Sequence, residues 1–108
     1  KTIREFADAK AEGRKIVVIT AYDSWSARLL AEAPVDCILV GDSVMMTLYG
    51  ERDTLGATTE IMATHTRLVA RNAPDKLIVA DMPFLSMRKG NACALDCAAA
   101  LLRAEPTR

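Results

Sequence analysis

The stretch Cys37-Ile38-Leu39-Val40-Gly41-Asp42-Ser43 joins a short apolar run to a glycine and two polar residues. Four consecutive apolar residues bounded by a turn signal are typical of a strand that is covered on both faces, as in parallel sheets. Similar runs lie on either side of it in the chain, Ile16-Val17-Val18-Ile19 and Leu77-Ile78-Val79-Ala80. The sequence therefore predicts three buried, parallel strands.

Between and beside these strands, apolar residues recur at the intervals of an amphipathic helix. We expect helices over residues 24–33, 59–71 and 91–104, and a shorter one before Gly13 that begins with a Thr2–Glu5 capping box. In the first helix the residues at these intervals are Trp25, Leu29, Leu30 and Ala33, and in the second Ile61, Met62, Leu68 and Val69 share one helical face. A leading helix followed by three repeats of strand and helix predicts an α/β fold built from right-handed βαβ units.

Length and composition restrict the class of protein. The chain has 108 residues, of which 51% are hydrophobic and 26% charged, so we expect one ordered globular domain at most. Its 14 basic and 14 acidic residues cancel, which leaves no general field to attract nucleic acid. No run reaches the ~18 apolar residues of a membrane span, and the first residues lack a signal-peptide core. We therefore expect a cytoplasmic protein without a nucleic-acid or membrane partner.

The three cysteines, Cys37, Cys93 and Cys97, cannot all pair with one another. We expect reduced thiols, as is usual in cytosolic proteins. Cys93 and Cys97 stand four residues apart on a predicted helix, where two thiolates would hold a soft metal if a third ligand came near. Packing as small core residues is the interpretation we favour.

An acidic residue follows each predicted strand: Asp23, Asp42 and Asp81. The carboxyl ends of parallel strands share one edge of the sheet, and ligands bind at that edge in α/β proteins. Carboxylate oxygens without nearby His or Cys suit Mg²⁺, which keeps several waters and takes further ligands from a substrate. The alternative is that each caps the following helix or turn, which is the better interpretation for a single Asp; for Asp42 and Asp81 together the two interpretations are balanced. Tyr22 and Trp25, on either side of Asp23, either wall a pocket there or fill the core.

Other residues near these strand ends carry weaker signals. Ser43 has an amide and a hydroxyl to offer an anionic substrate, although serine is also a common turn residue. His65 lies four residues after Ile61, so we expect a packed, hydrogen-bonded histidine rather than a catalytic base. Residues 43–58 form an unusually long connection, and such loops are frequently functional. No glycine-rich phosphate fingerprint follows any of the strands, so a dinucleotide site is not expected.

The three strand ends, taken together, resemble one known family. Ile19-Thr20-Ala21-Tyr22-Asp23, Leu39-Val40-Gly41-Asp42-Ser43 and Ala80-Asp81-Met82-Pro83-Phe84 are similar, in order and in spacing, to ketopantoate hydroxymethyltransferases. The similarity runs from about Ile3 to Ser86. Three linked motifs in register are a more specific signal than any one of them alone.

The resemblance implies a (β/α)₈ barrel enzyme of pantothenate and coenzyme A biosynthesis, of which these residues form the first three βα units. Such enzymes transfer a hydroxymethyl group from 5,10-methylenetetrahydrofolate to 3-methyl-2-oxobutanoate and give 2-dehydropantoate. The keto acid chelates Mg²⁺, which makes its C3 proton removable because the metal holds the enolate charge. On this chain the resemblance makes Asp42 and Asp81 the metal ligands, and it places both of them and Ser43 at the keto acid.

The resemblance also implies that the site is incomplete within these residues. The family's general base, a glutamate, and a lysine near the keto acid come from later strands, so we expect them beyond Arg108 and assign no catalytic residue here. We interpret residues 1–108 as a single partial barrel domain of a family that forms homo-oligomers at full length. We predict that the chain alone is inactive, because the base is missing and an unclosed barrel exposes sheet edges and apolar helix faces. We expect residues 98–102 to promote aggregation.

Three alternatives remain open. Another Mg²⁺-dependent keto-acid barrel, of the phosphoenolpyruvate mutase and isocitrate lyase group, handles enolates similarly and would be separated by its substrates. A phosphoacceptor receiver domain also clusters acids around Mg²⁺, but it needs five strands and a lysine after the last. A non-catalytic remnant that binds metal or joins a larger oligomer is the third, and a calorimetric Mg²⁺ titration of the chain and of Asp42→Ala tests it.

Overall fold

Strands and helices alternate along most of the chain in the structure, a computed structural model that describes residues 3–84, 86 and 89–104. In chain order the elements are α1 (Ile3–Ala11), β1 (Val18–Thr20), α2 (Ser24–Ala31), β2 (Cys37–Val40), α3 (Val44–Thr47), α4 (Thr59–Asn72), β3 (Leu77–Ala80) and α5 (Asn91–Ala104). The predicted bounds of β2, β3 and α5 are confirmed, and those of α4 differ by one residue.

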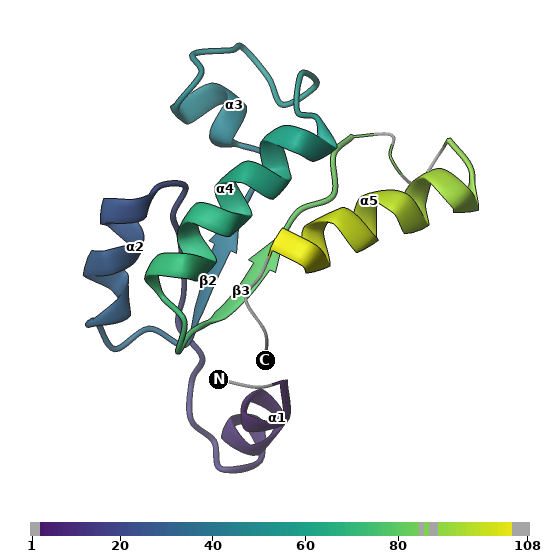
Figure 1. The fold of residues 1–108 in the computed structure, drawn as a ribbon. Coiled ribbons are helices and arrows are strands. Elements are labelled where there is room, and N and C mark those ends of the chain that lie inside the picture. Colours follow the sequence, from purple (N-terminus) through teal and green to yellow (C-terminus); the bar gives the residue numbers. More distant parts are fainter. Residues whose placement is uncertain (1–2, 85, 87–88, 105–108) are drawn as a thin grey trace.

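The three strands form one parallel sheet in the order β1-β2-β3. Ile19 pairs with Ile38, and Ile38 pairs with Ile78, so the carboxyl ends of all three strands lie at one edge. α4 packs on β2 and β3 and lies between α2 and α5 (Figure 1). The predicted α/β class with parallel strands is confirmed. The strand order also argues against a receiver domain, because receiver-like folds run 2-1-3-4-5.

The core lies between β2 and α4. Ile38 and Val40 on β2 are fully buried, and so are Met62 and Val69 on α4. Alternate residues of a strand point to opposite faces, so Ile38 and Val40 share the face that α4 covers, together with Ile78 of β3. This packing fixes the position of α4 over the middle of the sheet.

The prediction that the first strand is covered on both faces is wrong. β1 begins at Val18 and not at Ile16, and all three of its residues are exposed, Val18 at 52% and Ile19 at 40%. β1 pairs with β2 alone and is an edge strand of the described sheet, so its apolar side chains lack neighbours on that side. At the other edge, Val79 of β3 is also exposed.

Two of the apolar residues that recur at helical intervals in α2 lie outside the core, so the expectation that Trp25 walls a pocket or fills the core is wrong. Trp25 and Leu29, one helical turn apart, are 62% and 61% exposed, whereas Ala27 is fully buried. The stripe that contains Ala27 and the half-buried Leu30 faces the neighbouring elements, and α2 packs on α4. Small residues at this contact let two helices approach closely, which leaves the bulky side chains outside.

Several element ends follow local signals. Gly13 adopts a φ of +74° just after α1, a left-handed conformation that glycine allows at a helix end. The expected cap at Thr2 and the stop at Pro106 lie outside the described residues. The long connection after β2 contains the short helix α3, which the sequence did not predict. Among the described helices, none is long and apolar enough to cross a membrane.

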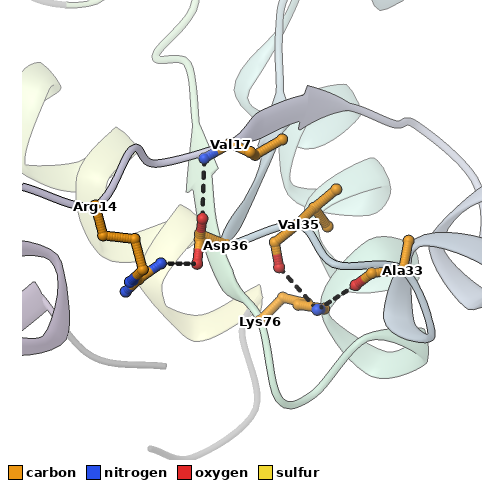
Figure 2. A network of polar contacts seen from close by, with 6 residues as sticks. All are labelled: Arg14, Val17, Ala33, Val35, Asp36 and Lys76. Carbon is orange, nitrogen blue, oxygen red and sulfur yellow. Dashed lines mark hydrogen bonds and ion pairs between the residues drawn. The ribbon is translucent and has the colours of Figure 1, made fainter. Parts of the chain in front are cut away.

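A polar network ties the chain together at the amino ends of the strands (Figure 2). Asp36, which is buried, accepts hydrogen bonds from the Val17 amide at 2.9 Å and from the Arg14 guanidinium at 3.2 Å. From the loop before β3, Lys76 donates to the carbonyl oxygens of Ala33 and Val35, each at 2.8 Å. The network links the segments that precede all three strands.

Candidate functional site

Asp42 and Asp81 meet at the carboxyl edge of the sheet. The amide of Asp42 donates to Oδ2 of Asp81 at 3.0 Å, and the amide of Asp81 donates to the Val40 carbonyl at 3.0 Å. The pairing of Val40 with Ala80 produces this contact, because it places the residues that follow the two strands side by side. Both aspartates are half-buried, so each retains access to solvent or a ligand.

Gly41 allows the polar groups here to approach one another. A Cβ at this buried position would lie 3.3 Å from Asp81 Oδ2 and 3.3 Å from Ser43 Oγ. Any side chain would therefore crowd both oxygen atoms. The glycine leaves a space bounded by a carboxylate and a hydroxyl, which is the kind of space that a bound ligand or ion can share.

Ser43 lies at the start of α3, but its side chain makes no hydrogen bond to that helix. Its Oγ lies 2.5 Å from the phenol oxygen of Tyr22, which comes from the turn between β1 and α2. When the Tyr22 hydroxyl donates to Ser43, the hydrogen of Ser43 remains available for a further acceptor. Tyr22 is thus part of the site, whereas Trp25 is exposed on α2.

His65 on α4 holds two of the loops around this site. Its Nδ1 lies 2.7 Å from the Tyr22 carbonyl, and its Nε2 lies 2.8 Å from the Tyr49 phenol oxygen. A carbonyl only accepts, so Nδ1 carries the proton, and in the neutral ring Nε2 accepts from Tyr49. The expectation of a packed, hydrogen-bonded histidine is confirmed. No sequence pattern predicts Tyr49 as its partner, because Tyr49 lies 16 residues away in an irregular loop.

Asp23 has a different role from the other two strand-end acids. It is the N-cap of α2, and its carboxylate accepts from the Ser26 amide at 2.8 Å. This is the capping alternative considered for each acid. The pair at the sheet edge is therefore Asp42 and Asp81, without Asp23.

The donor set of the pair suits a hard cation. The atoms offered are carboxylate oxygens, and the Asp42 carboxylate has no hydrogen-bond or ion-pair partner among the described residues. Within the same residues there is no cluster of three or more His, Cys, Asp or Glu side chains placed to hold a metal ion. Asp42 and Asp81 could thus supply two ligands, with the remainder coming from water or substrate, as Mg²⁺ accepts.

The cysteines lie away from this edge. Cys97 is buried in the core and Cys93 is half-buried, and both are free thiols. The described residues provide no third ligand for a soft-metal site on α5. The interpretation of Cys97 as a core residue is confirmed.

The chain is similar to one family of known proteins over almost its whole length. A family model described as ketopantoate hydroxymethyltransferase matches residues 1–107. Relatives named 3-methyl-2-oxobutanoate hydroxymethyltransferase are 46% identical over 100 residues in Coxiella burnetii and 50% identical over 103 residues in Pyrobaculum calidifontis. A third, from Acidithiobacillus ferrooxidans, is 51% identical over 104 residues. These matches cover 93%, 95% and 96% of this chain but 38%, 38% and 40% of the relatives, so the chain spans about two fifths of their length.

A solved structure shares the fold. The crystal structure of 2,3-dimethylmalate lyase, a member of the PEP mutase/isocitrate lyase superfamily, matches with a TM-score of 0.69 and 18% sequence identity. The match covers 94% of this chain and 36% of the lyase. At this level of sequence identity, the similarity shows a shared fold alone.

Proposed function

The chain belongs to the ketopantoate hydroxymethyltransferase family, and we propose that it forms the first three βα units of a barrel that makes 2-dehydropantoate for pantothenate and coenzyme A biosynthesis. In this reaction a hydroxymethyl group passes from 5,10-methylenetetrahydrofolate to 3-methyl-2-oxobutanoate. The names of the relatives support the reaction, and the likeness in fold supports a partial barrel.

One observation carries the proposal: the hydrogen bond of 3.0 Å between the Asp42 amide and Asp81 Oδ2. It places the Asp81 carboxylate against the backbone of Asp42, so that two acidic residues from neighbouring strands lie at the edge where barrel enzymes place their chemistry. We propose that Asp42 and Asp81 hold Mg²⁺ and contact the keto acid. When bound, the ion would supply positive charge that stabilises negative charge on the keto acid oxygens.

Ser43 and Tyr22 have a separate task, which is to orient the keto acid. We propose that the Tyr22 hydroxyl is the donor in its hydrogen bond with Ser43 Oγ, which leaves the Ser43 hydroxyl to donate to a carboxylate oxygen of the substrate. His65 keeps Tyr22 in place through the Tyr22 carbonyl. We place the general base beyond Arg108, so residues 1–108 bind and orient but do not remove the proton.

A calorimetric titration tests the metal site. We expect the chain to bind Mg²⁺ more tightly with 3-methyl-2-oxobutanoate present, because the keto acid completes the ligand shell. Asp42→Ala and Asp81→Asn should each weaken binding by at least about tenfold, the lower end of what supporting residues of metal sites contribute. Asp96→Asn, on the exposed face of α5, is the matched control and should bind as the unaltered chain does. Equal binding by all four proteins would refute the metal site.

An activity assay tests the reaction and the need for the remaining barrel. The chain alone should form no ketopantoate, whereas the chain mixed with the later barrel units of a relative should form it in a Mg²⁺-dependent manner. Mg²⁺-dependent turnover by the chain alone would contradict our placement of the base. Turnover of phosphonate or isocitrate substrates by the mixture, without ketopantoate formation, would favour the alternative keto-acid barrel.

A further inference from the structure

Tyr49 links the loop of residues 48–57 to helix α4. Its phenol oxygen lies 2.8 Å from His65 Nε2, and the two rings meet edge to face with their centroids 5.7 Å apart. The other hydrogen bonds of the loop are local, such as the one from the Glu51 amide to the Met45 carbonyl at 2.9 Å. Among the described residues, the Tyr49 phenol is the only group of this loop that is hydrogen-bonded outside the connection between β2 and α4.

His65 joins this contact to Tyr22. The histidine is 7% exposed, so the loss of a partner at either ring nitrogen costs free energy. Nδ1 lies 2.7 Å from the Tyr22 carbonyl oxygen, which only accepts, so in the neutral ring Nδ1 carries the hydrogen and Nε2 accepts from Tyr49. The opposite tautomer would leave Nδ1 facing the carbonyl without a hydrogen. The Tyr49 hydroxyl and the Tyr22 carbonyl therefore favour the same tautomer.

The chain of hydrogen bonds continues from Tyr22 to Ser43. The Tyr22 hydroxyl and Ser43 Oγ are 2.5 Å apart. Tyr22 is thus held twice, by its carbonyl at His65 and by its hydroxyl at Ser43. Ser43 and Tyr49 both belong to the connection between β2 and α4, and these bonds join them a second time across the site. A displacement of the loop at Tyr49 therefore reaches Ser43, because the bonds of a connected network strengthen one another.

We propose that Tyr49 is a positioning residue for the keto acid, and that it acts on Ser43 through the histidine and the tyrosine between them. The proposal rests on the proposed function, since it takes the keto acid as the ligand of Ser43. A keto acid that accepts from the Ser43 hydroxyl requires the Tyr22 hydroxyl as the donor to Ser43. This holds Tyr22, and through its carbonyl His65, in the arrangement that accepts from Tyr49. Binding of the keto acid and docking of residues 48–57 therefore strengthen each other by the same factor.

Nitrogen NMR of the imidazole ring tests the tautomer. His65 is the single histidine of the chain, so its two ring nitrogens give unambiguous signals. At a pH where the ring is neutral, we expect a protonated Nδ1 and an unprotonated Nε2. Tyr49→Phe removes the donor to Nε2, so the Nε2 signal should shift. Leu55→Ala is the matched control, because Leu55 lies in the same loop and is 59% exposed, and it should leave both signals unchanged.

Calorimetric titration with 3-methyl-2-oxobutanoate and Mg²⁺ tests the effect on the ligand. Tyr49→Phe should weaken keto acid binding about three- to tenfold, the effect of one net hydrogen bond, whereas Leu55→Ala should leave it unchanged. His65→Asn keeps an amide donor for the Tyr22 carbonyl but does not extend to Tyr49, so it should show a loss of similar size. In the His65→Asn background, Tyr49→Phe should have no further effect, because Tyr49 acts through the histidine.

Hydrogen exchange tests the reciprocal effect on the loop. The keto acid with Mg²⁺ should slow amide exchange in residues 48–57 of the unaltered chain, because it stabilises the docked loop. The slowing should be smaller in Tyr49→Phe and undiminished in Leu55→Ala.

Three results would overturn the inference and leave the proposed function intact. The first is equally tight keto acid binding by the unaltered chain and Tyr49→Phe, and the second is an unchanged Nε2 signal in Tyr49→Phe; a merely structural tyrosine would give both and would lower only the melting temperature. The third is an equal loss from Tyr49→Phe with and without His65→Asn, which would show that Tyr49 acts independently of the histidine. Failure of the unaltered chain to bind the keto acid with Mg²⁺ would instead overturn the proposed function together with this inference.

Discussion

β1 and β2 are made of similar residues and lie side by side, yet only β2 is buried. Val18 and Ile19 of β1 are 52% and 40% exposed, whereas Ile38 and Val40 of β2 are fully buried. β2 has a strand on each side and α4 above it, while β1 has one partner strand. A short apolar run thus specifies a strand, but the neighbours that other parts of the chain provide decide how much of it is covered.

The largest expected difference comes from one substitution made in both strands. Ile38→Ala should lower the free energy of unfolding by about 2–5 kcal/mol, because it leaves a cavity in a packed core. Ile19→Ala, at the paired position in β1, should cost less than about 1.5 kcal/mol, since less apolar surface is lost from burial. Urea unfolding followed by circular dichroism measures both. Equal losses of unfolding free energy in the two variants would show that β1 is covered in solution and that β1 and β2 do not differ in burial.

The next effect concerns the link between the two strands. Asp36→Ala should lower the free energy of unfolding by about 1–3 kcal/mol, because it leaves the Val17 amide without its acceptor. Arg14→Ala removes another partner of Asp36, but the Arg14 side chain is 47% exposed, so the loss should stay below about 1 kcal/mol. Hydrogen exchange at β1 is the second measurement. Faster exchange in Asp36→Ala is expected at β1 and not at β2, and uniform acceleration would contradict the local role.

A smaller loss of stability is expected when α4, the helix that covers β2, is weakened at its amino end. Thr58→Ala removes the N-cap of this helix and should cost about 1 kcal/mol. Thr64→Ala is the matched control, because its hydroxyl bonds to the Glu60 carbonyl within the helix and alanine favours helix. Unfolding by urea should show Thr64→Ala to be neutral or slightly stabilising. If both variants lose stability equally, the Thr58 bond to Ile61 contributes nothing specific.

The smallest change in stability is expected at the exposed side of α5. Leu102 is 73% exposed, so Leu102→Gln should alter the free energy of unfolding by no more than about 0.5 kcal/mol. It should nevertheless reduce self-association, because exposed apolar surface promotes contact between copies. Light scattering against protein concentration measures this effect, with Asp96→Asn on the same helix as the control. Unchanged scattering in Leu102→Gln would show that association uses another surface, such as the sheet edges.

Some features of the site, like some features of the strands, could be predicted from the sequence, and others could not. Asp42 and Asp81 could be placed together from sequence, because residues that follow parallel strands must share an edge. Helix capping by Asp23 was one of the two interpretations that the sequence left open. The sequence could not predict the bond between Tyr22 and Ser43 or the position of Tyr49 at His65. Each depends on the course of an irregular loop, for which the sequence carries no periodic signal.

By itself the sequence determined that the chain alternates strands and helices, that its strands run parallel and that two aspartates follow neighbouring strands. Local periodicity and turn residues carry that information, because they act over a few consecutive positions. Only the tertiary structure decided that β1 is exposed, that α2 packs through Ala27, and that the Ser86 hydroxyl is buried without a hydrogen-bond partner among the described residues. Burial and hydrogen bonding depend on which distant segments lie next to a residue. Those contacts form only when the whole chain folds, so no short stretch of sequence specifies them.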